Sequence, residues 1–158
     1  MDDKPSLETM EEEAKVAMAR LKEVEVHKGW TEFGDNPCKM FKMDIDGRTA
    51  AKGEAIINFT FDEVVIFLSD ITSLKKLNSQ VNSIKILHQY SENIKVNHQG
   101  YDGIWPVAGR DIVILTAKEK ANENKFYVAS KSCQFPVPEA KGIVRAEVFI
   151  AGYIIERV

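Results

Sequence analysis

The chain has 158 residues, of which 44% are hydrophobic and 28% are charged, and its formal net charge at pH 7 is −3. This length and composition predict one globular domain, residues 1–158, with a single core, and the mildly acidic balance argues against broad binding to nucleic acid. No apolar run reaches the roughly 18 residues of a membrane-spanning helix, and the N-terminus does not resemble a signal peptide. Cys38 and Cys133 lie far apart in the sequence, without the spacing of a metal site or of a disulfide framework. We therefore expect a cytoplasmic protein with no cofactor and no bound metal.

Residues 6–27 are predicted to form the first helix. Their apolar side chains recur at three- and four-residue steps, and Ser6 suits the N-cap position. The apolar positions are Leu7, Met10, Ala14, Ala17, Met18, Leu21 and Val24. The run Glu11–Glu13 is predicted to face solvent, and an acidic docking surface is the alternative.

The region after this helix predicts a β-hairpin. Trp30 and Phe33 are expected to lie in a loop that closes one end of the core, because large aromatic side chains are usually buried. Strands are predicted at residues 39–44 and 48–59, where polar and apolar residues alternate. The dipeptide Asp46-Gly47 between them is a strong signal for a two-residue hairpin turn.

A pair of short helices follows, and then a second hairpin. Thr60 and Glu63 have the spacing of a capping box, which predicts that a helix begins there. A second short helix or turn is expected over residues 74–81, through Leu74, Leu77 and Val81. The strand-like segments 84–87 and 94–96 flank a polar turn and predict the hairpin.

Three more strand-like segments complete the chain, at residues 111–117, 125–134 and 142–158. About seven strands in hairpins are therefore predicted, with a helix at the start and a short helix pair after the second strand. This is an α+β fold with a curved antiparallel sheet. Few helices are left to cover the sheet, so we expect an apolar cavity with a few polar groups on its concave face.

The sequence offers few signs of catalysis. His27, His88 and His98 lack the spacing of a metalloprotease motif and have no obvious serine or cysteine partner. His88 and His98 could face each other across the predicted hairpin, although two ordinary strand histidines are the favoured interpretation. No glycine-rich phosphate loop is present. We therefore predict no catalytic residues and no enzymatic activity.

Three motifs in the second half of the chain occur in a characteristic order. They are Trp-Pro-x-x-x-Arg-Asp at 105–111, Ser-x-x-x-Pro-x-Pro at 132–138 and Gly-x-Val-Arg-Ala-Glu at 142–147. Together with the order of elements, they resemble a START lipid-transfer domain from about Trp30 onward. The resemblance implies a helix-grip fold of the START and Bet v 1-like kind, C-terminally shortened and without the usual C-terminal helix. It also implies a non-enzymatic carrier that holds one sterol, glycerophospholipid or sphingolipid in a closed cavity.

The resemblance implies a set of lipid-binding positions. They are Asn78, Gln99, Ile112, Ile114, Thr116 and Ser130. Thr116 replaces an arginine of sterol carriers, and Ile112 replaces an aromatic residue of the choline-caging type. Asn78, Gln99 and Ser130 instead fall where ceramide-transfer START domains place their headgroup contacts, and neutral amides and hydroxyls suit a headgroup that carries both. These three side chains could equally satisfy backbone groups or bound water.

Two loops are implied to meet the membrane, and four charged residues are expected to be structural. Membrane contact is predicted for Trp105, Pro106, Pro136, Val137 and Pro138, and burial of Trp105 in the core is the alternative. The ion pairs Arg110 with Asp111 and Arg145 with Glu147 are expected to stabilise the scaffold rather than to contact ligand.

The end of the chain departs from the START pattern, because a further strand and a lid helix would follow in that family. Helix 6–27 or a second subunit is expected to close the cavity, and an uncovered groove or terminal strand would favour a homodimer. Two functions remain open. The first is lipid transfer with transient membrane association, and the second is a ligand-sensing or protein-interaction module with an open groove. An enzyme of the related cyclase type lacks an acid–base pair.

Overall fold

The structure is a computed structural model that describes residues 3–158, and these residues form two compact units. The larger unit contains the chain up to Leu21 together with Thr60–Val158, and the smaller unit contains Lys22–Phe59. The elements of each unit are described separately below. Within residues 3–158, no helix has the length and apolar character needed to cross a membrane.

The smaller unit is a three-stranded antiparallel sheet in the order β1 (Thr31–Gly34), β2 (Lys39–Ile45) and β3 (Arg48–Glu54). The predicted hairpin is confirmed, because Asp46 and Gly47 adopt φ angles of 49° and 77° in the turn between β2 and β3. The predicted second strand was too long, since β3 ends at Glu54 rather than at Phe59.

The prediction that two aromatic residues close the core from a loop was wrong for Phe33, whereas Trp30 does lie in a loop. Phe33 belongs to the edge strand β1 and is 51% exposed, and the ammonium group of Lys42 lies over its ring. Trp30 is half-buried, and its indole nitrogen donates to the Val24 carbonyl at 2.9 Å. With about half of its surface in solvent, the Phe33 side chain does not plug a core.

The larger unit is built on a second sheet with the strand order β4-β5-β6-β7-β9. The bounds of these antiparallel strands are β4 (Val81–Gln89), β5 (Ile94–Tyr101), β6 (Arg110–Asn122), β7 (Lys125–Ser132) and β9 (Ala151–Glu156). The short strand β8 (Val144–Arg145) pairs with the start of β6 in parallel. The single strand predicted at 142–158 is therefore two strands, and residues 3–158 contain nine strands rather than about seven. No helix follows β9 within these residues.

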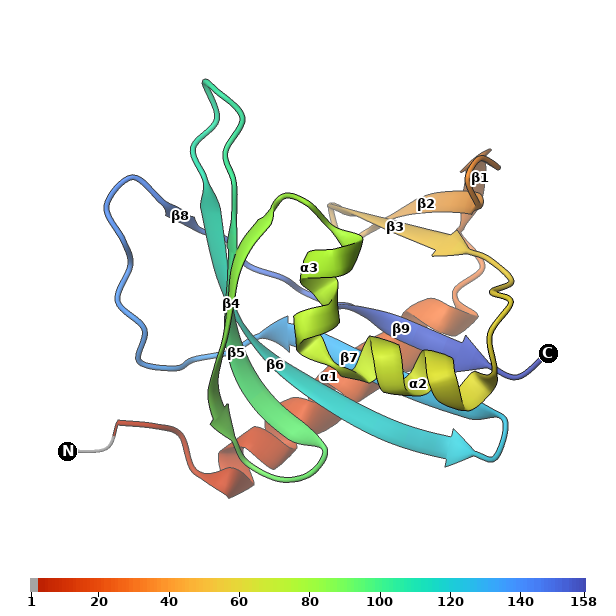
Figure 1. Cartoon of the computed structure of the whole chain (residues 1–158), viewed down its shortest axis with the longest axis horizontal. Coiled ribbons are helices and arrows are strands. Elements are labelled where there is room, and N and C mark those ends of the chain that lie inside the picture. The colour runs from red at the N-terminus through yellow and green to blue at the C-terminus, as the bar shows by residue number, and fades with distance from the viewer. Residues whose placement is uncertain (1–2) are drawn as a thin grey trace. The chain divides into compact units, whose positions relative to one another are not determined.

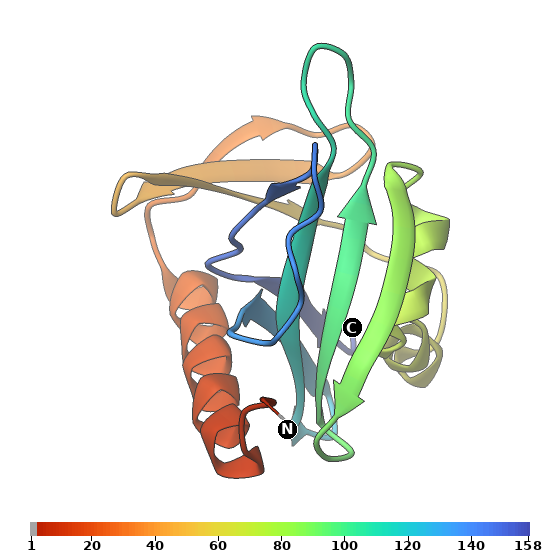
Figure 2. The same ribbon diagram turned by 90° about the vertical axis from the view of Figure 1, so that its left-hand side faces the viewer.

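Helices of the larger unit lie on opposite sides of this sheet (Figures 1 and 2). One side carries α1 (Leu7–Val26), and the other carries α2 (Phe61–Ser69), the 3-10 turn η1 (Ile71–Ser73) and α3 (Leu74–Leu77). We call the two sides of the sheet the α1 face and the α2 face.

The predicted buried stripe of the first helix is confirmed from Met10 to Leu21, whereas Leu7 is exposed and Val24 is partly buried. The buried residues of α1 are Met10, Ala14, Ala17, Met18 and Leu21. Two polar contacts fasten the helix to the larger unit. Glu13 forms an ion pair with the buried Lys131 of β7, and the Arg20 guanidinium lies 3.9 Å from the centre of the Phe149 ring and donates to the Phe149 carbonyl.

The predicted capping box is also confirmed, and it positions α2. The Thr60 hydroxyl accepts from the backbone nitrogen of Glu63 at 3.2 Å, and the Glu63 carboxylate accepts from the backbone nitrogen of Thr60 at 2.8 Å. These bonds satisfy amide groups that a helix start leaves free and hold the Glu63 pKa below its ordinary value.

Side chains of β6 alternate between the two faces of the sheet. Leu115 pairs with Lys131, which contacts α1, so Leu115 faces α1. Ile114 and Thr116 consequently face α2. The alternation therefore places the neutral polar residues of this strand on the same face as α2 and η1.

Candidate functional site

A cavity of about 310 Å³ lies between the α2 face of the sheet and the segment formed by α2, η1 and α3. Residues of the sheet and of this helical segment form its walls. The lining residues are Leu68, Ser69, Asp70, Ile71, Ser73, Leu74, Gln99, Tyr101, Ile112, Ile114, Thr116, Val128, Ser130, Val148, Ala151, Gly152 and Tyr153. Apolar walls with a few polar groups are typical of small-molecule sites, whose volumes begin near ~300 Å³.

A chain of hydrogen bonds crosses β5, β6 and β7 on the α2 face. The Tyr101 hydroxyl donates to Gln99 Oε1 at 2.7 Å, and Gln99 Nε2 donates to Asn97 Oδ1 at 2.8 Å. Asn97 Nδ2 then donates to Thr116 Oγ1 at 3.3 Å, and Thr116 Oγ1 lies 2.9 Å from Ser130 Oγ. Asn97 is 0% exposed and Gln99 is 2% exposed. Because their amides satisfy each other, this buried network is compatible with a stable sheet and orders the polar atoms beside the cavity.

Ser69 differs from these paired groups. It is the last residue of α2, and its hydroxyl oxygen is the only buried side-chain N or O atom without a hydrogen-bond partner in the part of the chain that the structure describes. An unpaired buried polar group costs about 1–3 kcal/mol. The cavity wall therefore contains one hydroxyl that has no protein partner.

Asp70 is the one charged side chain among the lining residues described above. Its carboxylate accepts from the hydroxyl and the backbone nitrogen of Thr72, at 2.7 and 2.9 Å, and these bonds hold its pKa below the ordinary value. The positive charges of Lys95 and Lys76 lower this pKa further. Asp70 is thus negatively charged at neutral pH, and no cationic side chain belongs to the lining set.

The structure brings five of the six sequence-predicted lipid-binding residues together. Gln99, Ile112, Ile114, Thr116 and Ser130 line the cavity. Asn78 does not line it. It follows α3, where its side-chain oxygen accepts from the backbone nitrogen of Gln80 at 3.0 Å and closes a local turn.

Sequence reasoning missed six polar residues of this region, which are Ser69, Asp70, Ser73, Asn97, Tyr101 and Tyr153. Asn97 and Tyr101 lie two residues on either side of Gln99, so strand alternation already placed them on its face. Burial raises the pKa of the Tyr153 hydroxyl, and the pKa of Tyr101 is raised by burial and by the nearby Tyr153. Both phenols therefore stay neutral hydrogen-bonding groups at neutral pH.

The predicted membrane-contact loop between β5 and β6 projects beyond the neighbouring strands (Figure 1). Trp105 is 93% exposed and Ile104 is 67% exposed, so neither is buried in a core. A backbone hydrogen bond from Val107 to the Ile104 carbonyl closes the tip at 2.7 Å. At the base, a Cβ atom on Gly103 would lie 2.5 Å from the Val107 carbonyl oxygen and 2.6 Å from the Gly109 nitrogen, so this close approach requires glycine.

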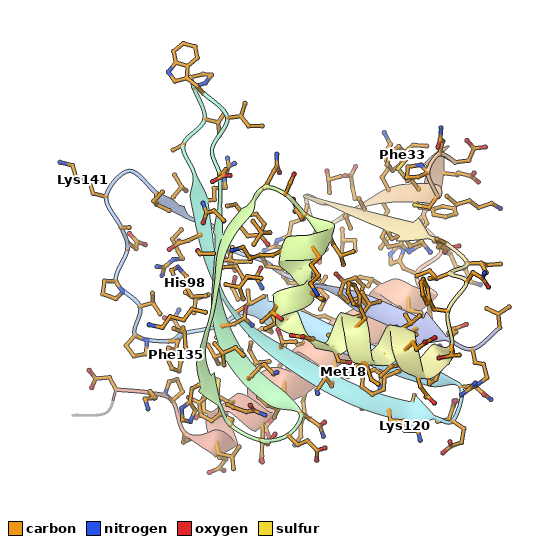
Figure 3. The ribbon with its side chains drawn as sticks, viewed as in Figure 1. Met18, Phe33, His98, Lys120, Phe135 and Lys141 are labelled. Carbon is orange, nitrogen blue, oxygen red and sulfur yellow. The ribbon has the colours of Figure 1, made fainter. Side chains whose placement is uncertain are left out.

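The second predicted loop runs from β7 to β8 and returns to the base of the first. The Val144 nitrogen donates to the Gly109 carbonyl at 3.0 Å. Pro136 and Pro138 are exposed and Val137 is partly buried. Figure 3 shows Lys141 at the outer bend of this loop, pointing away from the sheet.

The charged residues pair differently from the sequence prediction. Asp111 is 5% exposed, and its carboxylate accepts from Arg145 Nε and Nη2, at 2.7 and 3.1 Å, and lies 2.7 Å from His98 Nε2. The Arg145 hydrogen bonds hold the Asp111 pKa below its ordinary value, and the same contact raises the Arg145 pKa. Arg110 and Glu147 are exposed instead. Neighbouring residues of a strand point to opposite faces, which explains why Arg110 does not accompany Asp111.

Arg145 also connects this cluster to the second loop. Its guanidinium donates to the Val137 and Pro138 carbonyls, at 3.3 Å each. Asp111, His98 and Arg145 therefore link β5, β6, β8 and the β7–β8 loop (His98 is labelled in Figure 3).

The histidines and cysteines form no recognisable catalytic group. His88 and His98 do not face each other, because His88 pairs with Val96 and His98 pairs with Lys85. Burial raises the pKa of the Cys133 thiol to about 11, which makes it a poor nucleophile at neutral pH. Residues 3–158 contain no cluster of three side chains suited to hold a metal ion.

Solved structures with the same arrangement are found among lipid-transfer proteins. Human StAR-related lipid transfer protein 5 superposes with a TM-score of 0.86 at 14% identity, over 96% of this chain and 76% of that one. Human STARD10 superposes with a TM-score of 0.73 at 19% identity, over 87% of this chain and 58% of that one. A fragment of a STAR-related lipid transfer protein from Xanthomonas axonopodis superposes with a TM-score of 0.67 at 23% identity. The match covers 80% of this chain and 72% of that one. These likenesses show the α+β helix-grip fold that the sequence predicted.

Comparison at the level of sequence assigns the family. No curated protein sequence matches the chain. The family model of the START domain, however, matches residues 9–158, which is nearly the whole sequence. The chain belongs to the START domain family.

Proposed function

We propose that the whole chain acts as one lipid-binding domain, which holds a single lipid in the cavity between α2 and the sheet and transfers it between membranes without reacting with it. The observation that carries the proposal is the composition of the cavity wall, which combines aliphatic side chains with the neutral groups of Gln99, Tyr101, Thr116 and Ser130. Membership of the START family and the lipid-transfer titles of the similar structures support it.

The proposed ligand is a ceramide, another sphingolipid or a glycerophospholipid. A ceramide headgroup carries an amide and hydroxyls, and the wall presents the same kinds of group. Gln99 supplies an amide, and Thr116 and Ser130 supply hydroxyls. Each acyl methylene removed from water contributes about 0.8 kcal/mol, so the apolar walls would supply most of the affinity and the polar wall the orientation of the headgroup.

Docking to the membrane is proposed to use both loops. Trp105 and Pro106 form the exposed tip of the first loop, and Pro136, Val137 and Pro138 belong to the second. Indole rings favour the region between lipid headgroups and acyl chains. The attachment would be transient, because one small apolar tip buries too little surface for a stable anchor.

One observation favours a second candidate function, a ligand-sensing or protein-interaction module. Helix α2 is strongly apolar and yet has no buried residue, and Ile66 is 73% exposed. A partner protein could cover this side of the helix. A homodimer through β9 belongs to the same proposal, because β9 pairs only with β7 among the described strands.

Native mass spectrometry of the purified protein tests the main proposal. We expect one lipid molecule per chain, released on denaturation and identified by its mass. Delipidated protein should then take up one equivalent of a fluorescent ceramide or phospholipid from vesicles. A protein that is purified without lipid and takes up neither lipid would refute the proposal, and capture of a protein partner in its place would favour the interaction module.

A further inference from the structure

The loop between β7 and β8 is fastened to the sheet at its two ends and at one place between them. At the ends, the Cys133 nitrogen donates to a carbonyl of β6 at 3.2 Å, and the Val144 nitrogen donates to the Gly109 carbonyl at 3.0 Å. Between these ends, the backbone of residues 134–143 bonds only within the loop, in two local turns. Among the residues that the structure describes, Arg145 alone joins this stretch to another element by hydrogen bonds. The position of the loop therefore depends on one side chain.

The Arg145 guanidinium is itself held in a fixed orientation. The buried Asp111 carboxylate accepts from Nε and Nη2 at 2.7 and 3.1 Å, and this two-point contact fixes the plane of the guanidinium. Nη1 and Nη2 then donate to the Val137 and Pro138 carbonyls at 3.3 Å each. A lysine could pair with Asp111 as a point charge, but it has no planar fork to reach both carbonyls as well. The hold on the loop thus depends on the shape of the arginine and not on its charge alone.

Exposed apolar side chains of the two loops lie close together. The start of β8 pairs with the start of β6, where the first loop ends. A Cβ atom on Gly109 would lie 3.2 Å from Cδ1 of Ile143, so Ile143 packs against the base of the first loop. The exposed apolar residues are Ile104, Trp105 and Val107 on the first loop, and Ile143 and Val144 at the end of the second. Together they form one apolar surface that draws on both loops.

We infer that Arg145 is a positioning residue for membrane docking, which holds the β7–β8 loop beside the Trp105 loop so that both meet a lipid surface as one preformed unit. This inference rests on the proposed function and deepens it, because it names the residue on which joint docking depends. A loop that is held in place gives up little conformational entropy at the membrane, whereas a released loop must be ordered there. Arg145 does not belong to the lining set of the cavity, so lipid binding in solution should not depend on it.

Two substitutions separate the position of the loop from the stability of the fold. Arg145→Lys keeps a positive charge beside Asp111 but removes the fork to the two loop carbonyls. Asp111→Asn removes the ion pair but leaves Arg145 able to keep both carbonyl bonds. Arg110→Lys is the matched control, because Arg110 is the exposed neighbour of Asp111 on the same strand.

Three quantities are measured for each protein. Attachment is measured by sedimentation with vesicles of phosphatidylcholine that contain a minor share of phosphatidylserine. Lipid affinity is measured in solution by titration with a fluorescent ceramide and a fluorescent phospholipid. The melting temperature is measured without lipid.

We expect Arg145→Lys to weaken vesicle attachment about three- to tenfold, because the apolar side chains of the second loop no longer insert together with the first. Asp111→Asn should weaken attachment less, although it lowers the melting temperature more. Lipid affinity in solution should stay unchanged in both variants, and Arg110→Lys should change none of the three quantities. A purely structural role of Arg145 predicts the opposite order of attachment, since the ion pair is lost only in Asp111→Asn.

Hydrogen exchange of the wild type tests the inference without any variant, and so it also decides the question if a variant does not fold. The Val137 and Ile143 nitrogens donate within the loop at 2.8 and 3.1 Å, so their amides report on its order. We expect both amides to exchange slowly in free protein, and vesicles to protect the β7–β8 loop and the Trp105 loop together.

Three results would overturn the inference while leaving docking by Trp105 intact. They are attachment of Arg145→Lys equal to that of the wild type, a greater loss of attachment in Asp111→Asn, or vesicle protection confined to the Trp105 loop. If the wild type itself did not attach to vesicles, the docking step of the proposed function would fail instead.

Discussion

The Asp111 cluster gives a prediction whose size and sign both follow from the structure. In Asp111→Asn the side chain keeps its shape but loses its charge and one acceptor oxygen. Arg145 would then retain its hydrogen bonds to the Val137 and Pro138 carbonyls but lose its only ion pair among the described residues. His98 would lose the carboxylate at 2.7 Å.

Removal of one partner from a buried ion pair costs about 3–5 kcal/mol. Here the Arg145 and His98 side chains are 21% and 27% exposed, so water can partly replace the lost contact. We therefore expect a loss of about 2–3 kcal/mol in the free energy of unfolding at pH 7. For a chain of this size, this corresponds to a decrease of about 4–12 °C in Tm.

The pH dependence has a defined sign. The folded Asp111 carboxyl has a pKa below the ordinary value of 3.8, so its stabilising contribution is present above that value and is lost as the pH falls through the lowered pKa. The stability difference between wild type and Asp111→Asn should thus be constant near neutral pH and shrink below pH 3.8.

Urea denaturation followed by circular dichroism, at several pH values, measures this difference. Arg110→Gln is the matched control, because Arg110 is the exposed neighbour and should change stability by less than about 0.5 kcal/mol. A loss in Asp111→Asn that stays constant down to the acid limit of folding would show that the charge is not the cause. A large effect of Arg110→Gln would favour the pairing of Arg110 with Asp111.

Three further predictions concern the membrane tip, the capping box and the oligomeric state. Trp105→Ala should weaken attachment to vesicles roughly tenfold, about 1–2 kcal/mol, and slow vesicle-to-vesicle transfer, but leave lipid affinity in solution unchanged; unchanged transfer would argue against membrane contact. Thr60→Ala should lower the free energy of unfolding by about 1 kcal/mol in chemical denaturation, because it removes the N-cap of α2, and an unaltered midpoint would show that the capping box does not stabilise α2. If the edge of β9 joins two chains, light scattering at low concentration should report a dimer, and a delipidated monomer would contradict that proposal.

Sequence patterns predicted those helices and turns that depend on residues close together in the chain. The first helix was predicted at 6–27 and spans Leu7–Val26, because its buried stripe repeats with helical period over about three turns. The capping box at Thr60 and the Asp46-Gly47 turn were likewise confirmed, since each depends on residues close in sequence. In contrast, β8 is only two residues long and exists through its pairing with β6, more than 30 residues earlier. No local pattern marks such a strand.

The cavity residues also divide into those that a sequence pattern predicts and those that it does not. The family resemblance predicted Gln99, Thr116 and Ser130, and alternation along β5 was sufficient to add Asn97 and Tyr101. Ser69 could not be found from sequence, because a serine becomes significant only when every nearby acceptor and donor is known to be paired elsewhere. Asn78 lies outside the lining set, because a position aligned with a family contact can still turn its side chain toward its own backbone.

The glycine contact at the base of the first loop has a consequence for the proposed docking to membranes. Gly103 and Gly109 bring the two sides of the loop into backbone contact, and the Val107–Ile104 hydrogen bond closes its tip. The tip is therefore already ordered before it meets a surface. An anchor of this kind gives up little conformational entropy on insertion, so a single indole can suffice where a disordered segment would need several apolar side chains. For the proposed carrier, which must also leave the membrane, such an anchor would permit attachment without a large insertion.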